Sequence, residues 1–321
     1  MNRLRIGTRG SPLALWQARR VSEQIAKHNG PQTELVIIKT TGDRLSQTPV
    51  SEAGGKRLFV KEIEDALIEN RIDIAVHSAK DLPAARLPGL AISAALPRED
   101  PRDAVVVRQN AHERSTKEHV TPDDLFEKTK YGQRIGTGSV RRIAQLRHAF
   151  PELKIEPVRG NVGTRLQKLD DGNFDLLILA AAGLVRLDLA NRIALRIPST
   201  LCLPAPGQGI VVAEYRLKNS DIRNLFHKMS EQTTSAALAA ERAVVTALGA
   251  DCRVPLGALA TSSNGKLSLR GIVASPDGKQ LIRKELHGDI NSASDLGVMV
   301  ASALLADGAG DLLGPDSPSS G

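Results

Sequence analysis

The order of strand-like and helix-like segments constrains the fold of this chain more than any other feature. In the first hundred residues, LRIGT, ELVIIKT, IDIAVHSAKD and LAISAAL are typical of strands, and helix-like segments lie between them. Ser11 and Pro12 suit the cap and first turn of SPLALWQARRVSEQIAKH, and FVKEIEDALIENR is a second helix. Strands that are joined through a helix run parallel, so this order predicts a mostly parallel sheet with helices on its faces.

The same order returns in the middle of the chain. QRIGTGSVRRIAQLRHAF and LKIEPVRGNVGTRLQKLDDG each have the pattern of a strand, a glycine turn and a helix, and FDLLILAAAGL is typical of a buried strand. We expect a second α/β domain, joined to the first near PREDPRD, with LPAPGQGIVVAEYRL returning to the first sheet as a strand. Residues 108–132 are polar and predict a long exposed insertion.

The last part of the chain has a different character. TSAALAAERAVVTALGAD is strongly helical, and the later strand-like segments are separated by Asn264-Gly265 and Asp277-Gly278, which favour hairpins. A final helix, ASDLGVMVASALLADG, precedes GPDSPSSG, for which we expect disorder. We therefore predict three domains, with these bounds: 1–100 with a return segment at about 205–228, 103–203, and 230–321 as a small α+β domain with an antiparallel sheet.

Length and charge narrow the possible functions. The 321 residues exceed the roughly 250 that one hydrophobic core usually supports. Lysine and arginine exceed the acidic residues by 43 − 36 = +7, which admits nucleic acids and small polyanions as partners. Aromatic residues are only 2%, which argues against stacking platforms for single strands, and the arginines are dispersed rather than clustered. A cleft that binds carboxylates or phosphates fits this pattern better than a DNA-binding groove.

The cellular compartment is predicted from what the sequence lacks. No stretch is long and apolar enough to cross a bilayer, and MNRLRIGTRG does not resemble a signal peptide. The two cysteines, Cys202 and Cys252, do not make a disulfide framework. We therefore expect a cytoplasmic protein, and no spacing in the sequence indicates a metal site.

Four groups of polar residues follow predicted strands or turns. In open α/β sheets, ligands bind at the carboxyl ends of strands, where helix N-termini attract anions and arginine binds carboxylates through two hydrogen bonds. The spacing therefore predicts an anion-binding cleft between two α/β domains. The groups are Arg9 and Ser11; His77, Ser78, Lys80 and Asp81; Thr137, Ser139, Arg141 and Arg142; and Arg159, Asn161, Gly163 and Arg165.

Each group also has a purely structural interpretation. GTGS and GNVG are common in tight turns and helix caps, and neither is a phosphate-binding fingerprint. Arg141 and Arg142 could form a solvated helix face, and His77 could be a core histidine. Lys80 and Asp81 could be a surface ion pair.

The two cysteines differ in their surroundings. Cys202 lies in STLCLPAPG, between apolar residues, and is interpreted as inert packing. Cys252 lies in GADCRVPLG, a polar turn bounded by glycine and proline, where a side chain can be held out for chemistry. A small buried hydrophobic residue remains the alternative for Cys252.

Several long strings carry a resemblance to a known family. They are RIGTRGSPLALWQA, GGKRLFVKEIEDALIENRIDIAVHSAKDLP, REDPRDA, RGNVGTRLQKLD, LPAPGQG and DCRVPLG, and they span essentially the whole chain. These strings resemble the porphobilinogen deaminases, also called hydroxymethylbilane synthases. The resemblance implies two α/β domains like the lobes of periplasmic binding proteins, and a small third domain that carries the cysteine. It also implies a monomer.

The resemblance implies a deaminating polymerase of tetrapyrrole biosynthesis. Such an enzyme joins four porphobilinogen molecules head to tail on a dipyrromethane primer, releases ammonia at each step, and frees hydroxymethylbilane by hydrolysis. The primer cofactor is held by a thioether, for which Cys252 is the matching residue. A covalent anchor keeps the growing chain in the cleft. Hand-over of the product to the next enzyme of the pathway is a further expectation.

The resemblance also assigns roles to residues. Asp81 matches the catalytic aspartate, which can accept pyrrole N–H bonds and assist proton transfer. Phe59 matches a residue of a loop over the site, and Ser78, three positions before the aspartate, is assigned to cofactor and substrate binding. The positions that match carboxylate-binding residues, for acetate and propionate groups, are Arg9, Ser11, Lys80, Thr137, Ser139, Arg141, Arg142, Arg159, Arg165 and Arg186. Other polar positions of the cleft are matched by Gln17, Lys56, Asn161 and Gln208.

The sequence departs from the family pattern at a few positions. Glu52 stands where relatives often carry lysine, and Gly138 replaces a serine and so removes a hydroxyl donor. Asp251 replaces a glycine beside the cysteine, where a carboxylate disfavours the thiolate that Arg253 favours.

Two other functions remain open from the residues alone. A non-catalytic anion-binding protein with two lobes would account for the polar groups, but not for Cys252 or the third domain. A basic nucleic-acid-binding protein is disfavoured by the low aromatic content, and salt-dependent DNA binding would test it.

Overall fold

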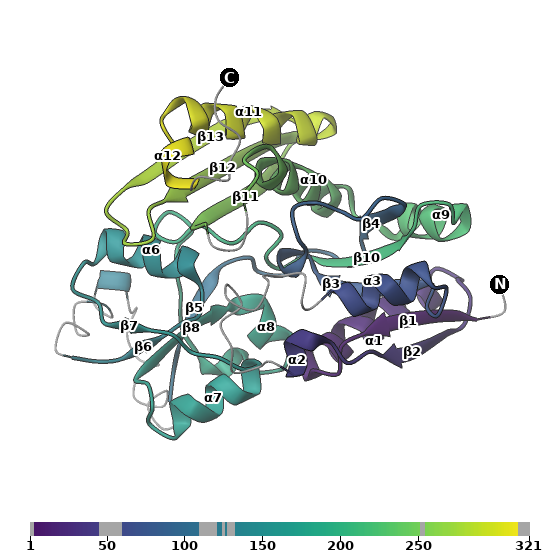
Figure 1. Ribbon diagram of the computed structural model, residues 1–321, viewed down its shortest axis with the longest axis horizontal. Helices are drawn as coiled ribbons and strands as arrows, with labels where there is room; N and C mark the ends of the chain where they lie inside the picture. Colours follow the sequence, from purple (N-terminus) through teal and green to yellow (C-terminus); the bar gives the residue numbers. More distant parts are fainter. Residues whose placement is uncertain are drawn as a thin grey trace.

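Three separate sheets organise the chain (Figure 1). The structure, a computed structural model, describes residues 3–44, 60–108, 121–123, 126, 132–250 and 254–313. In Figure 1 the purple and blue N-terminal part and the teal middle part lie side by side, and the yellow-green C-terminal part lies across both. We call these the first lobe, the second lobe and the C-terminal module. The predicted fold class, two α/β units with a small α+β unit, is confirmed.

The first lobe contains a five-stranded sheet in the order β2-β1-β3-β10-β4. β1 is parallel to β2 and β3, while β10 is antiparallel to both of its neighbours. The predicted returning strand is therefore confirmed as β10. The elements are β1 (Leu4–Thr8), α1 (Pro12–Lys27), β2 (Thr33–Ile37), α2 (Thr41–Arg44), α3 (Lys61–Ile68), β3 (Ile74–Ser78), the 3-10 helix η2 (Ala79–Asp81), β4 (Leu90–Ala94), β10 (Val211–Arg216) and α9 (Ser220–Met229).

Helix α1 begins and packs as its sequence predicts. The Ser11 hydroxyl accepts a hydrogen bond from the Ala14 amide at 3.4 Å, and proline occupies the first turn. Ala18, Val21 and Ile25 follow at helical spacing and are fully buried against the sheet. This packing fixes the N-terminus of α1 beside the end of β1.

The second lobe repeats the topology of the first, with the order β7-β6-β8-β5-β9. β6 is parallel to β7 and β8, and β5 is antiparallel to β8 and β9. The strand predicted for FDLLILAAAGL is wrong in its second half, because residues 181–186 form a helix. The elements are β5 (Asp103–Val107), β6 (Ile135–Gly136), α6 (Val140–Ala149), β7 (Ile155–Glu156), α7 (Val162–Asp170), β8 (Leu176–Ala180), α8 (Ala181–Arg186), the 3-10 helix η4 (Ala190–Arg192) and β9 (Ile193–Arg196).

The C-terminal module is an antiparallel sheet with helices packed on it. Asn264 and Gly265 both have positive φ, 50° and 75°, as the predicted hairpin turn between β11 and β12 requires. Helices α10 and α11 cover this sheet with one continuous apolar core. The elements are α10 (Gln232–Ala247), β11 (Leu256–Ser263), β12 (Lys266–Ala274), β13 (Leu281–Asp289), the 3-10 helix η5 (Ile290–Ser292), α11 (Ala293–Ala306) and α12 (Gly310–Leu313).

The expected exposed insertion at 108–132 is wrong at one residue. Phe126 is fully buried in the core of the second lobe, and its ring centroid lies 5.1 Å from that of Phe150. Most of the remaining insertion lies outside the described residues, as does GPDSPSSG at the C-terminus. Among the helices that the structure describes, none is long and apolar enough to cross a membrane.

One buried carboxylate ties the C-terminal module to the segments that connect the lobes. Glu241 of α10 is fully buried and accepts hydrogen bonds from Arg98 at 2.6 Å and from the Gly207 amide at 2.6 Å. Arg98 lies between β4 and β5, and Gly207 lies between β9 and β10. These two segments connect the lobes, and we call them the first and the second crossover. Glu241 also accepts from the Ala260 amide of β11 at 2.8 Å. One side chain of the module thus contacts both crossovers.

Candidate active site

The predicted polar groups lie where strands of both lobes end. Lys80 and Asp81 form η2, directly after β3, and Ser78 ends that strand. In the second lobe, Thr137 and Ser139 follow β6, and Arg159 follows β7. Because parallel strands end at the same edge of a sheet, each lobe presents its groups at one edge.

A buried glutamine holds the end of β3. Gln17 of α1 is 2% exposed, and its amide Nε2 donates to the Ser78 hydroxyl at 2.8 Å. Ser11 is engaged as the cap of α1, and the half-buried Arg9 directly follows β1. The predicted Gln17, Ser78 and Ser11 therefore act first on the local structure of the first lobe.

Lys80 is a cation of η2 whose pKa is lowered by its surroundings. Its Nζ donates to Oε1 of Gln208 at 3.4 Å. Lys80 is half-buried. The surrounding protein atoms remove water from its amine, and this desolvation lowers the pKa of Lys80 to about 8. Asp81 and Asp103 favour the charged form, while Arg142 and Arg141 oppose it. Lys80 therefore interacts with charges on both lobes.

Arg165 and Asp81 interact across the two lobes. Burial lowers the pKa of Arg165 to about 10, and the charge of Arg142 contributes in the same direction. The Asp81 carboxylate acts in the opposite sense, and Arg159 adds to the lowering. The Arg165 Nε donates to the Gly160 carbonyl at 2.8 Å, which fixes the start of its side chain. These interactions bring two predicted groups of the sequence together.

Arg141 and Arg142 are not a solvated helix face. They are 4% and 5% exposed, and both pair with the fully buried Asp103, each with an N–O distance of 2.8 Å. The two guanidinium groups hold the pKa of the Asp103 carboxyl well below its usual range, although burial alone would raise it. The alternative that we left open for this pair is therefore wrong, because α6 turns these side chains inward.

Gln208 and Cys202 complete the surroundings of Asp103. The Gln208 Nε2 donates to Asp103 Oδ1 at 2.8 Å, and the Cys202 thiol donates to Asp103 Oδ2 at 3.4 Å. Burial raises the pKa of Cys202 to about 12, and Asp103 adds to this. The thiol is buried, as expected, but it takes part in a polar cluster rather than in simple apolar packing. Its raised pKa makes it a poor nucleophile.

Arg186 is a further buried cation, at the end of α8. It is 5% exposed, and its Nη2 donates to the Gly209 carbonyl at 2.7 Å. Its guanidinium carbon lies 5.5 Å from the centroid of the Trp16 ring of the first lobe. Burial lowers the pKa of Arg186 to about 10, and Glu99 offsets part of this. Arg186 thus bridges the second lobe to α1 and to the second crossover.

Thr137, Ser139 and Asn161 serve the helix starts of the second lobe. Ser139 caps α6 and accepts from the Arg142 amide at 3.4 Å, and the exposed Asn161 caps α7. The buried Thr137 accepts from the Ser139 amide at 3.4 Å. A Cβ atom at Gly138 would lie 2.9 Å from the Val158 carbonyl oxygen, so this turn requires glycine. The absence of the family's serine therefore has a local structural reason.

His77 lies in the core, as expected. It is 6% exposed, and its Nε2 is 3.5 Å from Oε2 of the buried Glu214 in β10. The predicted Lys56, Phe59 and Cys252 lie outside the described residues, as do the departures at Glu52 and Asp251.

Comparison with known proteins identifies the family. Residues 4–224 match the family described as porphobilinogen deaminase, dipyromethane cofactor binding domain, and residues 236–306 match the porphobilinogen deaminase C-terminal domain. The chain belongs to the porphobilinogen deaminase family. Porphobilinogen deaminases from two strains of Acidithiobacillus ferrooxidans are 45% identical over 311 residues, which is 97% of this chain and 97% of each relative. The resemblance predicted from the sequence strings is confirmed.

The solved structures that the chain matches are more distant. The BenM effector binding domain with its effector benzoate is 18% identical, with a TM-score of 0.42, over 71% of this chain and 90% of that one. An amino acid ABC transporter substrate-binding protein from Streptococcus pneumoniae bound to L-arginine is 15% identical, with a TM-score of 0.40, over 71% and 86%.

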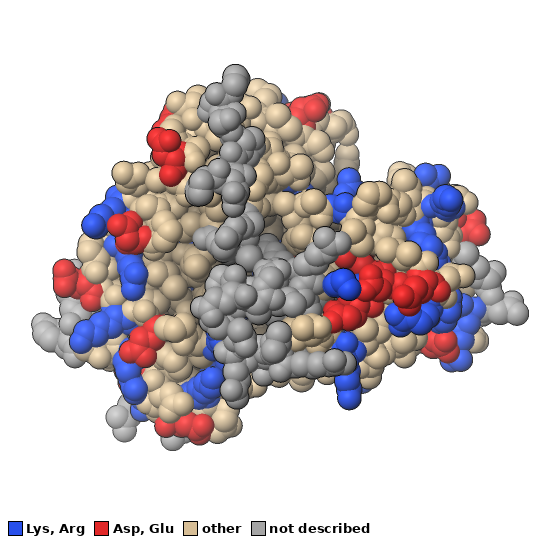
Figure 2. All heavy atoms as spheres, in the orientation of Figure 1, with Lys and Arg blue, Asp and Glu red and all other residues tan. Residues whose placement is uncertain are grey.

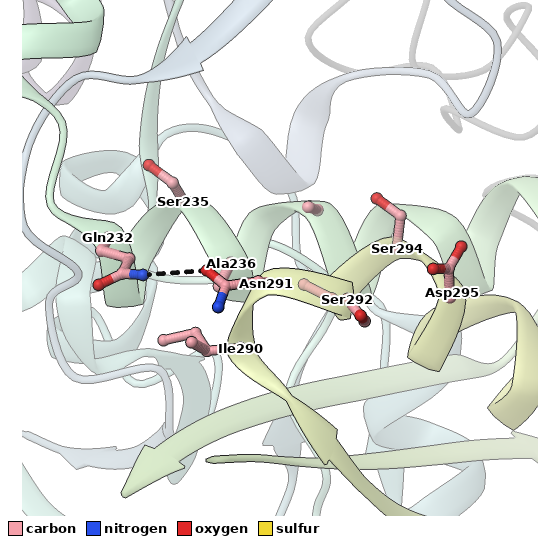
Figure 3. Close-up of a pocket in the computed structure, with 10 residues that line it drawn as sticks. Gln232, Ser235, Ala236, Ile290, Asn291, Ser292, Ser294 and Asp295 are labelled. Carbon is pink, nitrogen blue, oxygen red and sulfur yellow. Dashed lines mark hydrogen bonds between the residues drawn. The ribbon is translucent and has the colours of Figure 1, made fainter. Parts of the chain in front are cut away.

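The surface charge and a cavity in the C-terminal module do not indicate a second anion-binding site. On the face that Figure 2 shows, lysine and arginine are spread over both lobes and mixed with acidic residues rather than gathered in one basic surface. A cavity of about 280 Å³ lies between α10 and α11 (Figure 3), where Gln232 donates to Asn291 at 3.4 Å. Asp295 is the one ionisable side chain among the described residues that line it, so it does not suit the anionic substrates of this family.

Sequence reasoning missed the residues that hold the site together. Asp103 and Arg98 lie in the string PREDPRD, which we interpreted as the join between two domains without a role for either residue. Trp16 and Glu241 lie in helices whose patterns predicted packing alone. The available signal was the adjacent pair Arg141 and Arg142, which follows an apolar strand. When such a pair is buried, it needs a negatively charged side chain beside it in the protein interior. Among the described residues, no group of His, Cys, Asp or Glu side chains is placed to hold a metal ion.

Proposed function

We propose that the chain is a hydroxymethylbilane synthase of tetrapyrrole biosynthesis. It condenses four porphobilinogen molecules on a dipyrromethane primer, and it releases ammonia and then hydroxymethylbilane. The 45% identity to porphobilinogen deaminases over 97% of the chain carries this conclusion. Two matching family domains, one of them described as the dipyromethane cofactor binding domain, support it.

The cations of the cleft fit the primer cofactor. Burial lowers the pKa of Lys80 to about 8, and those of Arg165 and Arg186 to about 10. Among the described residues, the negative charge around these side chains does not offset the effect of burial. Acetate and propionate groups supply such charge, so a polycarboxylate ligand would stabilise all three cations. When bound, the dipyrromethane provides the pyrrole carbon on which the product chain grows.

The residues of the cleft divide the work of binding. We assign the carboxylates of cofactor and substrate to cationic and hydroxyl side chains, which bind through charge-assisted hydrogen bonds. Gln17 and Gln208 orient neighbouring groups, and Ser78 holds the start of η2. The assigned binding residues are Arg9, Ser11, Gln17, Lys56, Phe59, Ser78, Lys80, Thr137, Ser139, Arg141, Arg142, Arg159, Asn161, Arg165, Arg186 and Gln208.

Asp81 is assigned as the catalytic residue. It lies in η2 between the two lobes' charges and interacts with Lys80 and Arg165. An ionised carboxylate there accepts hydrogen bonds from pyrrole N–H groups and stabilises positive charge that develops on the ring. It can also take up and return the proton that accompanies loss of the amine.

The wider assignments rest on the same chemistry. We propose three domains, with the bounds 1–100 and 205–228, 103–203, and 230–321, since each would contain one of the three sheets. A cytoplasmic location suits an enzyme whose anchoring cysteine has to be a reduced thiol. We further propose a monomer that passes hydroxymethylbilane, a reactive product, to the next enzyme of the pathway.

The experiment that tests the function is the intact mass of the denatured protein. The chain is expressed in cells that make haem, and its mass is compared with those of Cys252→Ser and Cys202→Ser. We expect an excess of two porphobilinogen units less their ammonia, located on the Cys252 peptide, for the unaltered chain and for Cys202→Ser. Cys252→Ser should have the bare mass. An excess on the Cys202 peptide, or no turnover of porphobilinogen by the loaded protein, would contradict the assignment.

A further inference from the structure

The buried Asp103 carboxylate lies at the junction of both crossovers. It is the first residue of β5, directly after the first crossover, and is fully buried. Gln208, which reaches it, belongs to the second crossover. The Gln208 Nε2 also donates to the Pro101 carbonyl at 2.7 Å. One amide therefore fastens the end of one crossover to the end of the other.

Asp103 uses both of its oxygens. Oδ1 accepts from Arg142 Nε at 2.9 Å and from Gln208 Nε2 at 2.8 Å. Oδ2 pairs with Arg141 Nη2 at 2.8 Å and accepts from the Cys202 thiol at 3.4 Å. A buried carboxylate with this many donors is satisfied, and its removal would leave buried charges without a partner.

The two arginines are committed to the chain itself. Besides Asp103, Arg141 donates through Nη1 to the Leu203 carbonyl at 2.6 Å, and Arg142 donates through Nη1 to the Ile178 carbonyl at 2.8 Å. Both residues are at most 5% exposed. The half-buried Lys80 is better placed to meet a ligand from the cleft. An inner layer that positions and an outer layer that binds is the arrangement a preorganised site requires.

We propose that Asp103 is a positioning residue of the polymerisation. It is the internal counter-ion that holds Arg141 and Arg142 in the inner layer and, through Gln208, positions Lys80 for incoming carboxylates. This inference rests on the proposed function. Asp103 itself touches no substrate in this scheme. Its negative charge offsets part of the repulsion among the cations around it, so that they can lie together before a ligand arrives.

Lys80 reports on this role because it titrates near neutral pH. The groups that act on it are Asp81 beside it in η2, Arg141 and Arg142 from α6, and Asp103 from β5. Gln208 supplies the polar contact, at 3.4 Å. Asp103 favours the protonated amine, and both arginines disfavour it. Loss of the Asp103 charge should therefore lower the pKa of Lys80 below its value of about 8.

The test is the pH dependence of acetylation of Lys80 in the full-length protein. Acetic anhydride modifies only the neutral amine, and peptide mass spectrometry after labelling at a series of pH values gives the midpoint for each lysine. In Asp103→Asn we expect the Lys80 midpoint to fall by about one pH unit. In Asp103→Glu, which keeps the charge, it should stay within a few tenths of a unit of the unaltered protein.

Matched controls separate charge from packing. Cys202→Ser alters the same cluster without removing a charge and should leave the Lys80 midpoint in place. The exposed Lys61 of α3, measured in the same digests, should not change in any variant. A Lys80 midpoint that is equal in the Asn variant and the unaltered protein, or that falls equally in the Glu and Asn variants, would overturn the proposal.

A second variant covers a failure of Asp103→Asn to fold. Gln208→Met removes the contact between Asp103 and Lys80 and leaves both arginine pairs in place. The Lys80 midpoint should again fall, and an unchanged midpoint would overturn the role of Gln208 in the proposal. Because acetylation requires neither primer nor turnover, it reports on Asp103 even if the mass experiment were to contradict the proposed function.

Discussion

Replacement of Glu241 by alanine should lower the stability of the protein. Its carboxylate accepts from Arg98 at 2.6 Å and 3.2 Å, from the Gly207 amide at 2.6 Å and from the Ala260 amide at 2.8 Å. Glu241 is fully buried, and the Arg98 side chain is 12% exposed. The variant therefore leaves a buried guanidinium and two backbone amides without their acceptor.

The expected cost follows from this burial. Removing one partner of a buried ion pair costs about 3–5 kcal/mol, because the remaining charge stays in the interior without compensation. Since folded proteins are stable by about 5–15 kcal/mol, this is a large share of the total. For units of 150–250 residues, each kcal/mol changes the melting temperature by about 2–4 °C, so we expect a decrease of roughly 10 °C.

The assay is thermal unfolding followed by circular dichroism, with an exposed ion pair as the control. In α3, Lys61 Nζ lies 3.3 Å from Asp65 Oδ2, and the two side chains are 63% and 39% exposed. Asp65→Ala should therefore cost at most about 1 kcal/mol. A melting temperature for Glu241→Ala within about 2 °C of that for Asp65→Ala would refute the reasoning. Glu241→Gln, which keeps one acceptor oxygen, should lie between the two.

The other predictions concern the cleft. Asp81→Asn should lower kcat by at least about 100-fold, since the variant keeps the shape but loses the anion, with melting temperature and primer mass unchanged; near-normal kcat would exclude the catalytic role. The kcat/KM of the enzyme should fall as pH rises through about 8, because Lys80 loses its proton and with it the attraction for carboxylates. The corresponding fall in kcat should occur at higher pH, because bound carboxylates raise the pKa of Lys80. If kcat/KM and kcat fell at the same pH, this would count against Lys80 as a ligand-binding group. Gly138→Ser should destabilise by about 1–3 kcal/mol in urea unfolding, because its Cβ would lie 2.9 Å from the Val158 carbonyl oxygen, and equal stability would show that the turn can adjust.

Local signals predicted the elements that have a periodic pattern and a cap. Ser11, Pro12 and the buried stripe of α1 are one case, and the Asn264-Gly265 turn is another. Strands β5 and β9 were not anticipated from the sequence, and α8 was merged with β8. β5 is buried at every position, as are the first four residues of α8, so neither shows an alternation that could indicate its type. Short apolar runs leave the choice between helix and strand to tertiary packing.

The candidate site divides in the same way. Polar residues after predicted strands could be assigned to a cleft because sheet topology brings such ends together. The inward turn of Arg141 and Arg142 could not be predicted, because it depends on Asp103, which lies about forty positions earlier in the chain. Asp103 itself stands among charged residues in PREDPRD, a string that is typical of an exposed turn. Only the packed structure shows that this carboxylate is buried.

The topology explains why these missed residues matter. β10 and β5 occupy the fourth place in their sheets, and each is antiparallel to its neighbours. Each is also reached by a crossover from the other lobe, so any rotation of one lobe against the other has to bend both crossovers. The contact between Gln208 and Asp103 joins these crossovers directly, and Glu241 joins them again through Arg98, whose Nε donates to the Gln208 carbonyl at 3.0 Å. Because Gln208 also contacts Lys80, loss of Glu241 should change the acetylation midpoint of Lys80 as well as the melting temperature.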